Sequence, residues 1–416
     1  MYKFLLILSV SVTIHLSAQW TPIPIPPTYL FDEVEFIDLN TGWIISVDRV
    51  LKSTNGGFNW FLAGTVDMLL AHDMQFLDAN SGWLAGQDGK ISFTANGGTN
   101  WYTHTEPGGR NLYAVHFINC QTGWVSGSLG KVIKTTNSGI TWIDQASGTD
   151  WYLYSITFLD SLNGWTVGQY GTVRKTTNGG VNWTSQSLGT TNDLYEVSFL
   201  NSEVGWICGR NGFLKKTINS GINWTAQNTG TSHDIRKLRF NSQDTGWIIT
   251  GFGIINTNIL RTTNGGLNWH SQLNLDSEEL LNDMTFIGQT GWAIGNKNQS
   301  ARIYKTTNGG GNPVVIQEVG TFVPTEHTLA QNYPNPFNPQ TKIKFDVPPN
   351  VKGQTSNVKL VIYDLLGREI ATLVNEELSP GTYEADWNGS NFSSGVYFYK
   401  IVSGDFVETK KMVLMK

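Results

Sequence analysis

A short alternation of apolar and polar positions returns seven times along the first three quarters of the chain. In the third copy, residues 112–117 alternate, a polar turn follows, and the pair Gly123-Trp124 opens a second short apolar run. Alternation over four to eight residues predicts a half-buried β-strand. The Gly-Trp pair recurs at intervals of 40 to 45 residues, with its tryptophan at Trp43, Trp83, Trp124, Trp165, Trp206, Trp247 and Trp292. Seven copies of a unit of about 41 residues predict a repeat fold.

Each unit contains four predicted strands. In the third unit they cover residues 112–117, 124–127, 131–136 and 140–145. Seven four-stranded sheets indicate an all-β, seven-bladed β-propeller, whose radial arrangement protects the sheet edges. No stretch before residue 320 combines a 3.6-residue apolar period with helix caps, which excludes a helical repeat.

A second element, Ser/Thr-x-Asn-Gly/Ser-Gly, follows each Gly-Trp pair. Asn-Gly between strands favours a tight hairpin with positive φ at both central positions, and the Asn side chain can accept bonds from amides of its own turn. The tryptophan three residues after the second glycine is expected to pack between neighbouring sheets. The repeated asparagines, expected to be structural, are Asn55, Asn96, Asn137, Asn178, Asn219, Asn264 and Asn308.

The seventh copy of this element lacks its tryptophan, because Pro313 stands in that position. Trp20 lies 40 residues before Trp60 and 16 residues before Phe36. The separation of 16 residues recurs between later tryptophans of this element and a phenylalanine of the following unit. We therefore predict that Trp20 closes the ring and that residues 19–25 form the outer strand of the seventh blade. The prolines of this region suit an edge strand.

Composition and charge narrow the class of protein. Of 416 residues only 15% are charged, while 45 are glycine and 16 are tryptophan, which excludes a disordered chain. A net charge of −5 without a long basic run argues against nucleic-acid binding. The two cysteines, Cys120 and Cys208, cannot form a disulfide framework, and both are expected to be free and mostly buried.

The two ends of the chain differ from the repeats. Residues 1–18 are typical of a secretory signal peptide, since Lys3 precedes an apolar run that is too short to span a bilayer. No membrane span is predicted in the mature protein. The propeller is expected over residues 19–313, a linker over 314–328 and a small β-sandwich over 329–416.

Both parts resemble known families. The Asn-Gly element resembles the Asp-box, or BNR motif, and the whole unit resembles the propeller repeats of the photosystem II assembly and stability factor family. Residues 329–416 resemble the type A C-terminal sorting domain of the type IX secretion system, through Asn332-Tyr-Pro-Asn-Pro-Phe-Asn-Pro339, Tyr363-Asp-Leu-Leu-Gly-Arg368, Gly395-Val-Tyr-Phe-Tyr399 and Thr409-Lys-Lys-Met412. The second resemblance implies that residues 329–416 engage the type IX machinery, which exports the protein to the outer-membrane surface or beyond.

Catalytic motifs are missing from the sequence. It contains no Gly-x-Ser-x-Gly, His-Glu-x-x-His or Cys-x-x-Cys, and the histidines are scattered, so no metal or cofactor is predicted and no catalytic residue is assigned. Loops that differ between the repeats are a better guide to a binding site than motifs are. Exposed aromatic and polar side chains in such loops suit a sugar or peptide chain. The candidate ligand-binding residues are Trp151, Tyr152, Tyr170, Arg110, Arg210 and Asp193. The alternative is that these are ordinary solvated loops.

We expect a secreted or cell-surface propeller that binds an extracellular glycan or protein. The alternative is a glycoside hydrolase, sialidase- or xyloglucanase-like, that acts on extracellular polysaccharide. A pair of carboxylates across the channel would favour the enzyme, whereas an aromatic, carboxylate-poor mouth would favour binding. Candidate loop carboxylates are Asp48, Asp88, Asp150, Asp193, Asp234 and Asp276.

Overall fold

The computed structural model divides into two compact units, Trp20–Gly310 and Met1–Gln19 together with Gly311–Lys416. It describes residues 14–16, 20–25, 30–252, 255–275, 278–298, 300–310, 315–318, 323–349, 356–389 and 392–416. Most of the predicted signal peptide and much of the predicted linker lie outside these ranges. Within them, no helix is long and apolar enough to cross a membrane.

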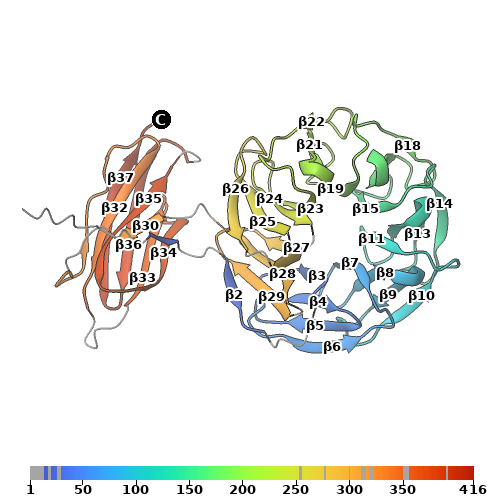
Figure 1. Ribbon diagram of the computed structural model, residues 1–416, viewed down its shortest axis with the longest axis horizontal. Coiled ribbons are helices and arrows are strands. Elements are labelled where there is room, and N and C mark those ends of the chain that lie inside the picture. The colour runs from blue at the N-terminus through green and yellow to red at the C-terminus, as the bar shows by residue number, and fades with distance from the viewer. Residues whose placement is uncertain are drawn as a thin grey trace, which may run out of the picture. The chain divides into compact units, whose positions relative to one another are not determined.

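The first unit is a ring of seven four-stranded antiparallel sheets, which confirms the seven-bladed propeller (Figure 1). The innermost strands are β3 (Glu33–Phe36), β7 (Ala71–Phe76), β11 (Leu112–Phe117), β15 (Leu153–Phe158), β19 (Leu194–Phe199), β23 (Ile235–Phe240) and β27 (Glu279–Ile287). The second strands are β4 (Gly42–Ser46), β8 (Gly82–Gly86), β12 (Gly123–Gly127), β16 (Gly164–Gly168), β20 (Gly205–Gly209), β24 (Gly246–Phe252) and β28 (Thr290–Lys297). The third strands are β5 (Arg49–Ser53), β9 (Lys90–Thr94), β13 (Lys131–Thr135), β17 (Val173–Thr176), β21 (Leu214–Thr217), β25 (Ile255–Thr262) and β29 (Ser300–Thr306).

The outermost strands are more exposed than the other three. They are β6 (Phe61–Thr65), β10 (Tyr102–Thr105), β14 (Ile143–Ala146), β18 (Thr184–Ser185), β22 (Thr225–Ala226), β26 (His270–Asn274) and β2 (Thr21–Ile23). Four blades carry a short 3-10 turn between the second and third strands: η1 (Gln87–Gly89), η2 (Ser128–Gly130), η3 (Gln169–Gly171) and η4 (Arg210–Gly212). The fourth strand of the third blade begins at Ile143 rather than at the predicted Ile140, because the preceding turn reaches Trp142.

The seventh blade is built from both ends of the propeller. Strand β2 pairs antiparallel with β29, so that Thr21 lies opposite Lys305 and Ile23 opposite Ile303. Trp20 is 2% exposed and meets Phe286 edge-on, with ring centroids 5.7 Å apart and planes at 85°. In the six other blades the corresponding tryptophan and phenylalanine lie 5.7 to 6.1 Å apart at 79° to 90°. Trp20 thus occupies the position of the tryptophan that the seventh element lacks.

The Gly-Trp pairs hold neighbouring blades together. The ring of Trp43 stacks on Phe76 of the next blade at 3.8 Å, and Trp292 stacks on Phe36 at 3.7 Å, which joins the last blade to the first. The glycine is needed for close packing: a Cβ at Gly123 would lie 2.5 Å from the ring of Phe117. These tryptophans are core residues, as their recurrence in every blade predicts.

The Asn-Gly element is a turn stapled by its asparagine. In the second blade, Asn96 Oδ1 accepts hydrogen bonds from the Thr94 hydroxyl at 3.0 Å and from the Asn100 amide at 2.9 Å. The left-handed residues are Gly97 and Gly98, with φ of 67° and 91°, and not the predicted Asn-Gly pair. The reason is that the asparagine closes the turn through its side chain, which leaves the tight reversal to the two residues that follow.

Both cysteines are free. Cys208 is buried in β20, as expected, but Cys120 is exposed, so the prediction of burial is wrong for it. Cys120 belongs to the turn between β11 and β12, where side chains face solvent.

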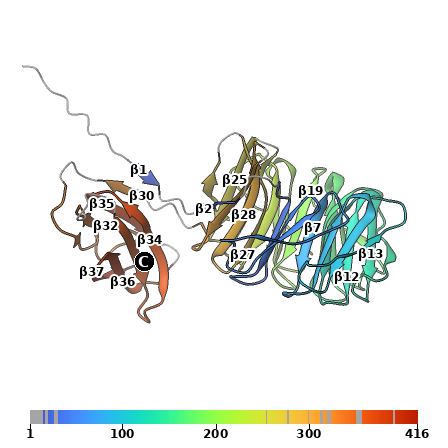
Figure 2. The same cartoon turned by 90° about the horizontal axis from the view of Figure 1, so that it is seen from below.

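The second unit is a small β-sandwich, as predicted, but it also includes residues 315–318 of the predicted linker and residues 14–16 of the predicted signal peptide. One sheet has the order β1-β30-β35-β32-β31, from β1 (Ile14–Leu16), β30 (Val315–Glu318), β35 (Gly381–Asn388), β32 (Gln340–Val347) and β31 (Thr328–Leu329). The other has the order β34-β33-β36-β37, from β34 (Glu369–Leu378), β33 (Ser356–Tyr363), β36 (Gly395–Ser403) and β37 (Phe406–Leu414). Figure 2 shows the two layers from the side. Phe345 and Trp387 of the first sheet pack with Leu360 and Tyr399 of the second, and all four are buried.

Candidate ligand-binding site at the channel mouth

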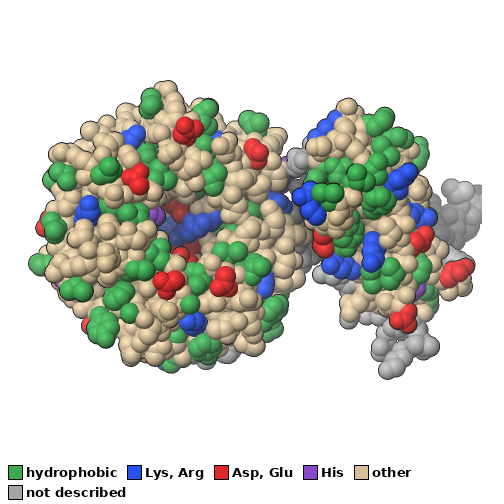
Figure 3. Space-filling view, turned by 180° about the vertical axis from the view of Figure 1, so that it is seen from behind, with side chains coloured by type: hydrophobic (Ala, Val, Ile, Leu, Met, Phe, Trp, Pro, Cys, Tyr) green, Lys and Arg blue, Asp and Glu red, His purple; other side chains and the backbone are tan. Residues whose placement is uncertain are grey.

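Each blade lines the channel with a six-residue segment, and the seven segments share one sequence pattern. They begin at Phe31, Ala71, Leu112, Leu153, Leu194, Ile235 and Leu281. The second residue of this segment differs from blade to blade, in ring order Asp32, His72, Tyr113, Tyr154, Tyr195, Arg236 and Asn282. Six of these residues line a cavity of about 490 Å³. All seven blades contribute residues to its lining, so the cavity is the mouth of the central channel. Figure 3 shows the ring hollowed at its centre, with basic and acidic side chains inside.

Five consecutive blades contribute a continuous row of side chains, four aromatic rings and one guanidinium group, which we call the mouth arc: His72, Tyr113, Tyr154, Tyr195 and Arg236. Neighbouring ring centroids are 5.3, 5.4 and 6.0 Å apart along the row. The guanidinium carbon of Arg236 lies 5.4 Å from the centre of the Tyr195 ring, within the range of a cation–π contact. All five side chains are half-buried. The arc therefore combines fixed rings with accessible edges and faces.

Two tyrosines of the arc, Tyr154 and Tyr195, keep their protons. Burial and the nearby charge of Asp193 raise the pKa of Tyr154 to about 12. Burial also raises the pKa of Tyr195, and its hydroxyl donates to Asp234 Oδ2 at 3.1 Å. Burial lowers the pKa of His72, which keeps its imidazole neutral at physiological pH. Tyr154 and Tyr195 consequently offer neutral hydroxyls, and the arc ends in one cation, Arg236.

A second aromatic pair lies on the loops of the fourth blade. Trp151 and Tyr170 meet edge-on, with centroids 4.5 Å apart, and are 49% and 56% exposed. Tyr170 has φ of 52°, a left-handed conformation that costs a bulky residue roughly 1–2 kcal/mol and that Asn and Asp adopt more readily. The equivalent residues of η1, η2 and η4 are Asp88, Leu129 and Asn211, so a bulky exposed residue takes this conformation in two of the four turns.

Two residues connect this pair to the arc. The ring of Tyr152, the neighbour of Trp151, lies 6.0 Å from Tyr113 and 6.5 Å from Tyr154. Asp193 lines the channel cavity, and its Oδ1 accepts the Tyr170 amide at 3.0 Å, which fixes the loop. Aromatic surface thus extends from the channel mouth across the loops of blade four.

Charged side chains fill the channel below the arc. Lys237 Nζ lies 2.9 Å from Glu33 Oε1 and 3.4 Å from Asp283 Oδ1. Arg239 lies 3.3 Å from Asp283 and also pairs with Glu196. Two cations thus bridge three carboxylates from other blades.

The channel carboxylates also accept backbone amides of the next blade. Asp283 Oδ2 accepts Val34 N–H at 3.1 Å, and Asp73 Oδ2 accepts Val115 N–H at 2.8 Å. Glu35 accepts the Phe76 amide at 2.5 Å, and Glu196 accepts the Leu238 amide at 2.5 Å, in the same way. Four carboxylates therefore staple one blade to the next and are held by structural bonds.

The pKa values of these acids shift in different directions. Burial raises the pKa of Glu33 and Glu35 well above the ordinary value and that of Asp73 to about 6. Burial opposes ionisation of Asp283 too, but Lys237 and Arg239 outweigh it and lower its pKa. The channel therefore holds carboxyls whose ionisation burial disfavours beside one, Asp283, whose ionisation its cationic partners favour.

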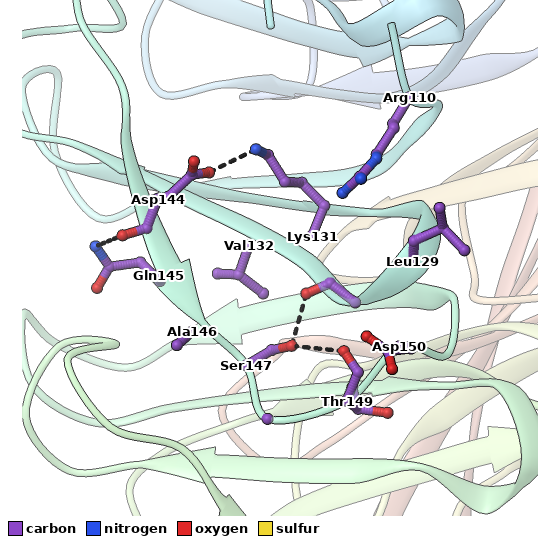
Figure 4. A pocket seen from close by; sticks show the side chains of 12 residues that line it. Arg110, Leu129, Lys131, Val132, Asp144, Gln145, Ala146, Ser147, Thr149 and Asp150 are labelled. Atoms are coloured by element: carbon purple, nitrogen blue, oxygen red, sulfur yellow. Dashed lines mark hydrogen bonds and ion pairs between the residues drawn. The ribbon is translucent and has the colours of Figure 1, made fainter. Parts of the chain in front are cut away.

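The residues predicted from sequence divide into two groups. Tyr152 and Asp193 adjoin the arc, and Trp151 and Tyr170 extend it. Arg110 lies elsewhere, in a pocket of about 550 Å³ with Lys131, Asp144 and Asp150 (Figure 4).

Arg210 lines neither of these two cavities, although its carbonyl accepts Asn192 Nδ2 at 3.2 Å. Among the loop aspartates, Asp234 Oδ1 accepts the Asn211 amide at 3.0 Å, as Asp193 does for Tyr170. Asp276 lies outside the described residues. Two of the loop carboxylates are thus committed to holding turns.

Comparison with known protein families finds one match in each of the two units. Residues 331–415 match the model of the secretion system C-terminal sorting domain. Residues 140–230 match that of the photosynthesis system II assembly factor YCF48. No curated protein matches the sequence.

Solved structures share the fold at low identity. YCF48 bound to D1 peptide is 19% identical, with a TM-score of 0.57 over 70% of this chain and 95% of that one. YCF48 from Cyanidioschyzon merolae is 18% identical, with a TM-score of 0.56 over 68% and 98%. The GH74 enzyme of Niastella koreensis is 12% identical, with a TM-score of 0.56 over 79% of this chain and 59% of that one. The chain thus joins a propeller with YCF48-like BNR repeats to a type IX secretion system C-terminal sorting domain.

Proposed function

We propose that this protein is an exported binding module and that its propeller binds an extracellular polysaccharide chain at the channel mouth. The sorting domain indicates secretion or display at the cell surface. The mouth arc carries the proposal. A residue needed only for the fold recurs in every blade, as the Gly-Trp tryptophans do, whereas the arc residues change from blade to blade at one structural position.

The chemistry of the arc favours sugar. A pyranose ring presents a face of C–H groups that packs on an aromatic ring and a rim of hydroxyls that need hydrogen-bond partners. The arc supplies three tyrosine rings with their hydroxyls, and Asp193, Arg236 and Asn282 line the same cavity. The exposed pair Trp151 and Tyr170 lies beyond, which suits a chain of several sugar units.

A glycoside hydrolase is the second candidate. It is supported by the fold shared with the GH74 enzyme and by Asp73, a channel-lining carboxyl whose pKa near 6 suits a general acid. Against it, the Asp73 carboxylate already accepts the Val115 amide, and the other channel acids are similarly bonded or ion-paired. Binding without turnover therefore has the stronger support.

A glycan array probed with the full-length mature protein tests this function. The selected glycan should bind the Tyr154→Ala variant at least tenfold more weakly, and Trp151→Ala or Tyr152→Ala more weakly with little change in melting temperature. Tyr102→Ala is the matched control, because Tyr102 is 72% exposed on the outer strand β10. Unchanged affinity of Tyr154→Ala, or binding of peptides and no glycan, would contradict the proposal. Cleavage of the selected glycan that Asp73→Asn abolishes would establish the hydrolase instead.

A further inference from the structure

The β33–β34 hairpin of the sorting domain ends in an unusual turn. Tyr363 lies opposite Glu369, and residues 364–368 form the turn between them. At its tip, Leu365 and Leu366 are 71% and 78% exposed. Turn tips ordinarily carry Gly, Asn, Asp or Ser, which are polar or tolerate positive φ. Two adjacent leucines in solvent therefore need an explanation.

A neighbouring hairpin of the same sheet shows the ordinary arrangement. Between β36 and β37, Ser403 lies opposite Phe406, and the loop is Gly404-Asp405, with Gly404 at φ of 59°. A turn of this sheet can therefore be polar, and nothing in the sheet itself requires the two leucines of the β33–β34 turn.

The leucine turn is held rigid by a single acid. Asp364 Oδ1 accepts the amides of Leu366 and Arg368, both at 2.9 Å. Its Oδ2 accepts Arg368 Nε at 2.6 Å, and its own amide donates to the Arg368 carbonyl at 3.0 Å. The two leucines are therefore presented on a preorganised turn, which lowers the entropic cost of docking them into a partner.

We propose that Leu365 and Leu366 form an apolar knob through which the sorting domain docks into an apolar socket of the export machinery. The occupant follows from the domain, because residues 331–415 match a sorting domain, which another protein must recognise for export. The charges around the tip support an apolar contact: Asp364 and Arg368 neutralise each other, so the knob offers its partner no net charge. The proposal does not depend on the ligand of the propeller.

Export of full-length variants in a host with a type IX secretion system tests the knob. In L365S/L366S the fraction of protein at the surface or in the medium should fall at least tenfold, with accumulation in the periplasm. L365M/L366M should restore export, since methionine keeps the apolar volume. The matched control is V407S, because Val407 is 54% exposed on β37 of the same sheet. Its export should equal that of the wild type.

Normal export of L365S/L366S would overturn the proposal. So would sedimentation showing that the wild type self-associates and the variant does not, because the knob would then bind a second copy of this chain. If the double variant lowers the melting temperature of the sorting domain, L365S and L366S are compared singly. Each is expected to reduce export, and normal export of both would again overturn the assignment.

Discussion

Replacing Trp20 by alanine tests how the propeller ring is closed. Trp20 packs with Trp247, Leu281 and Phe286 in one buried cluster, although it is separated from them by more than 200 residues of sequence. It also lies directly against Gly310, because a Cβ there would come within 2.4 Å of the Trp20 indole nitrogen. The substitution removes the anchor of the outer strand of the seventh blade.

The size of the effect follows from burial. A tryptophan side chain buries roughly 150–250 Å². At about 25 cal/mol per Å², this corresponds to an upper value of roughly 4–6 kcal/mol. Large-to-alanine substitutions of aromatic core residues cost about 3–5 kcal/mol. The Trp20 indole N–H has no hydrogen-bond partner among the described residues, so the loss comes from packing. We expect a loss of about 3–5 kcal/mol.

Urea unfolding of the propeller transition, followed by circular dichroism, measures this loss. Trp151→Ala is the control, since Trp151 is 49% exposed and its removal should change the free energy of unfolding by about 0.5 kcal/mol or less. A change for Trp20→Ala below about 1 kcal/mol would refute the closure of the ring by the N-terminal strand.

Three further outcomes are expected. The pKa of Asp73 is about 6 in the folded protein and 3.8 ordinarily, so the folded state holds the carboxyl proton more tightly than the unfolded state does. The stability that Asp73 contributes therefore falls as the pH rises from about 4 to 6. Asp73→Asn should therefore gain stability over the wild type between pH 4 and 7 in urea unfolding, and equal curves would refute this. Gly123→Ala should lower the free energy of unfolding by about 1–3 kcal/mol, because the new Cβ collides with Phe117; an unchanged melting temperature would count against it. Deletion of residues 329–416 should leave the propeller folded and trapped in the periplasm, and normal surface display would disprove the role of the sorting domain.

The repeat made the fold predictable. A 41-residue period fixes the number of blades, and the phase of the Gly-Trp pairs within it assigns most strands to the right residues. The details of the turns were less accessible. Asn96 closes its turn through a side-chain bond, and the two glycines after it take the left-handed conformation. The propensity of Asn-Gly for tight turns could not distinguish this side-chain-closed turn from an ordinary two-residue hairpin.

The candidate site was only partly predictable. Trp151, Tyr152 and Tyr170 break the repeat in loops, where a search for asymmetry finds them. None of the five residues of the mouth arc was predicted, because they lie in strands, where the alternation of apolar and polar positions already explained their presence. Aligning the seven innermost strands in phase would have exposed the variable second position. Distance information was needed to separate Arg110 from the channel, since its loop is close in sequence to Tyr113.

A crystal structure of the full-length protein with the glycan selected by the array would show whether a polysaccharide chain lies across the mouth arc. We expect sugar rings stacked on Tyr113, Tyr154 and Tyr195, with the chain continuing toward Trp151 and Tyr170. Sugar bound instead in the pocket beside Arg110 and Lys131, with an empty channel mouth, would contradict this expectation.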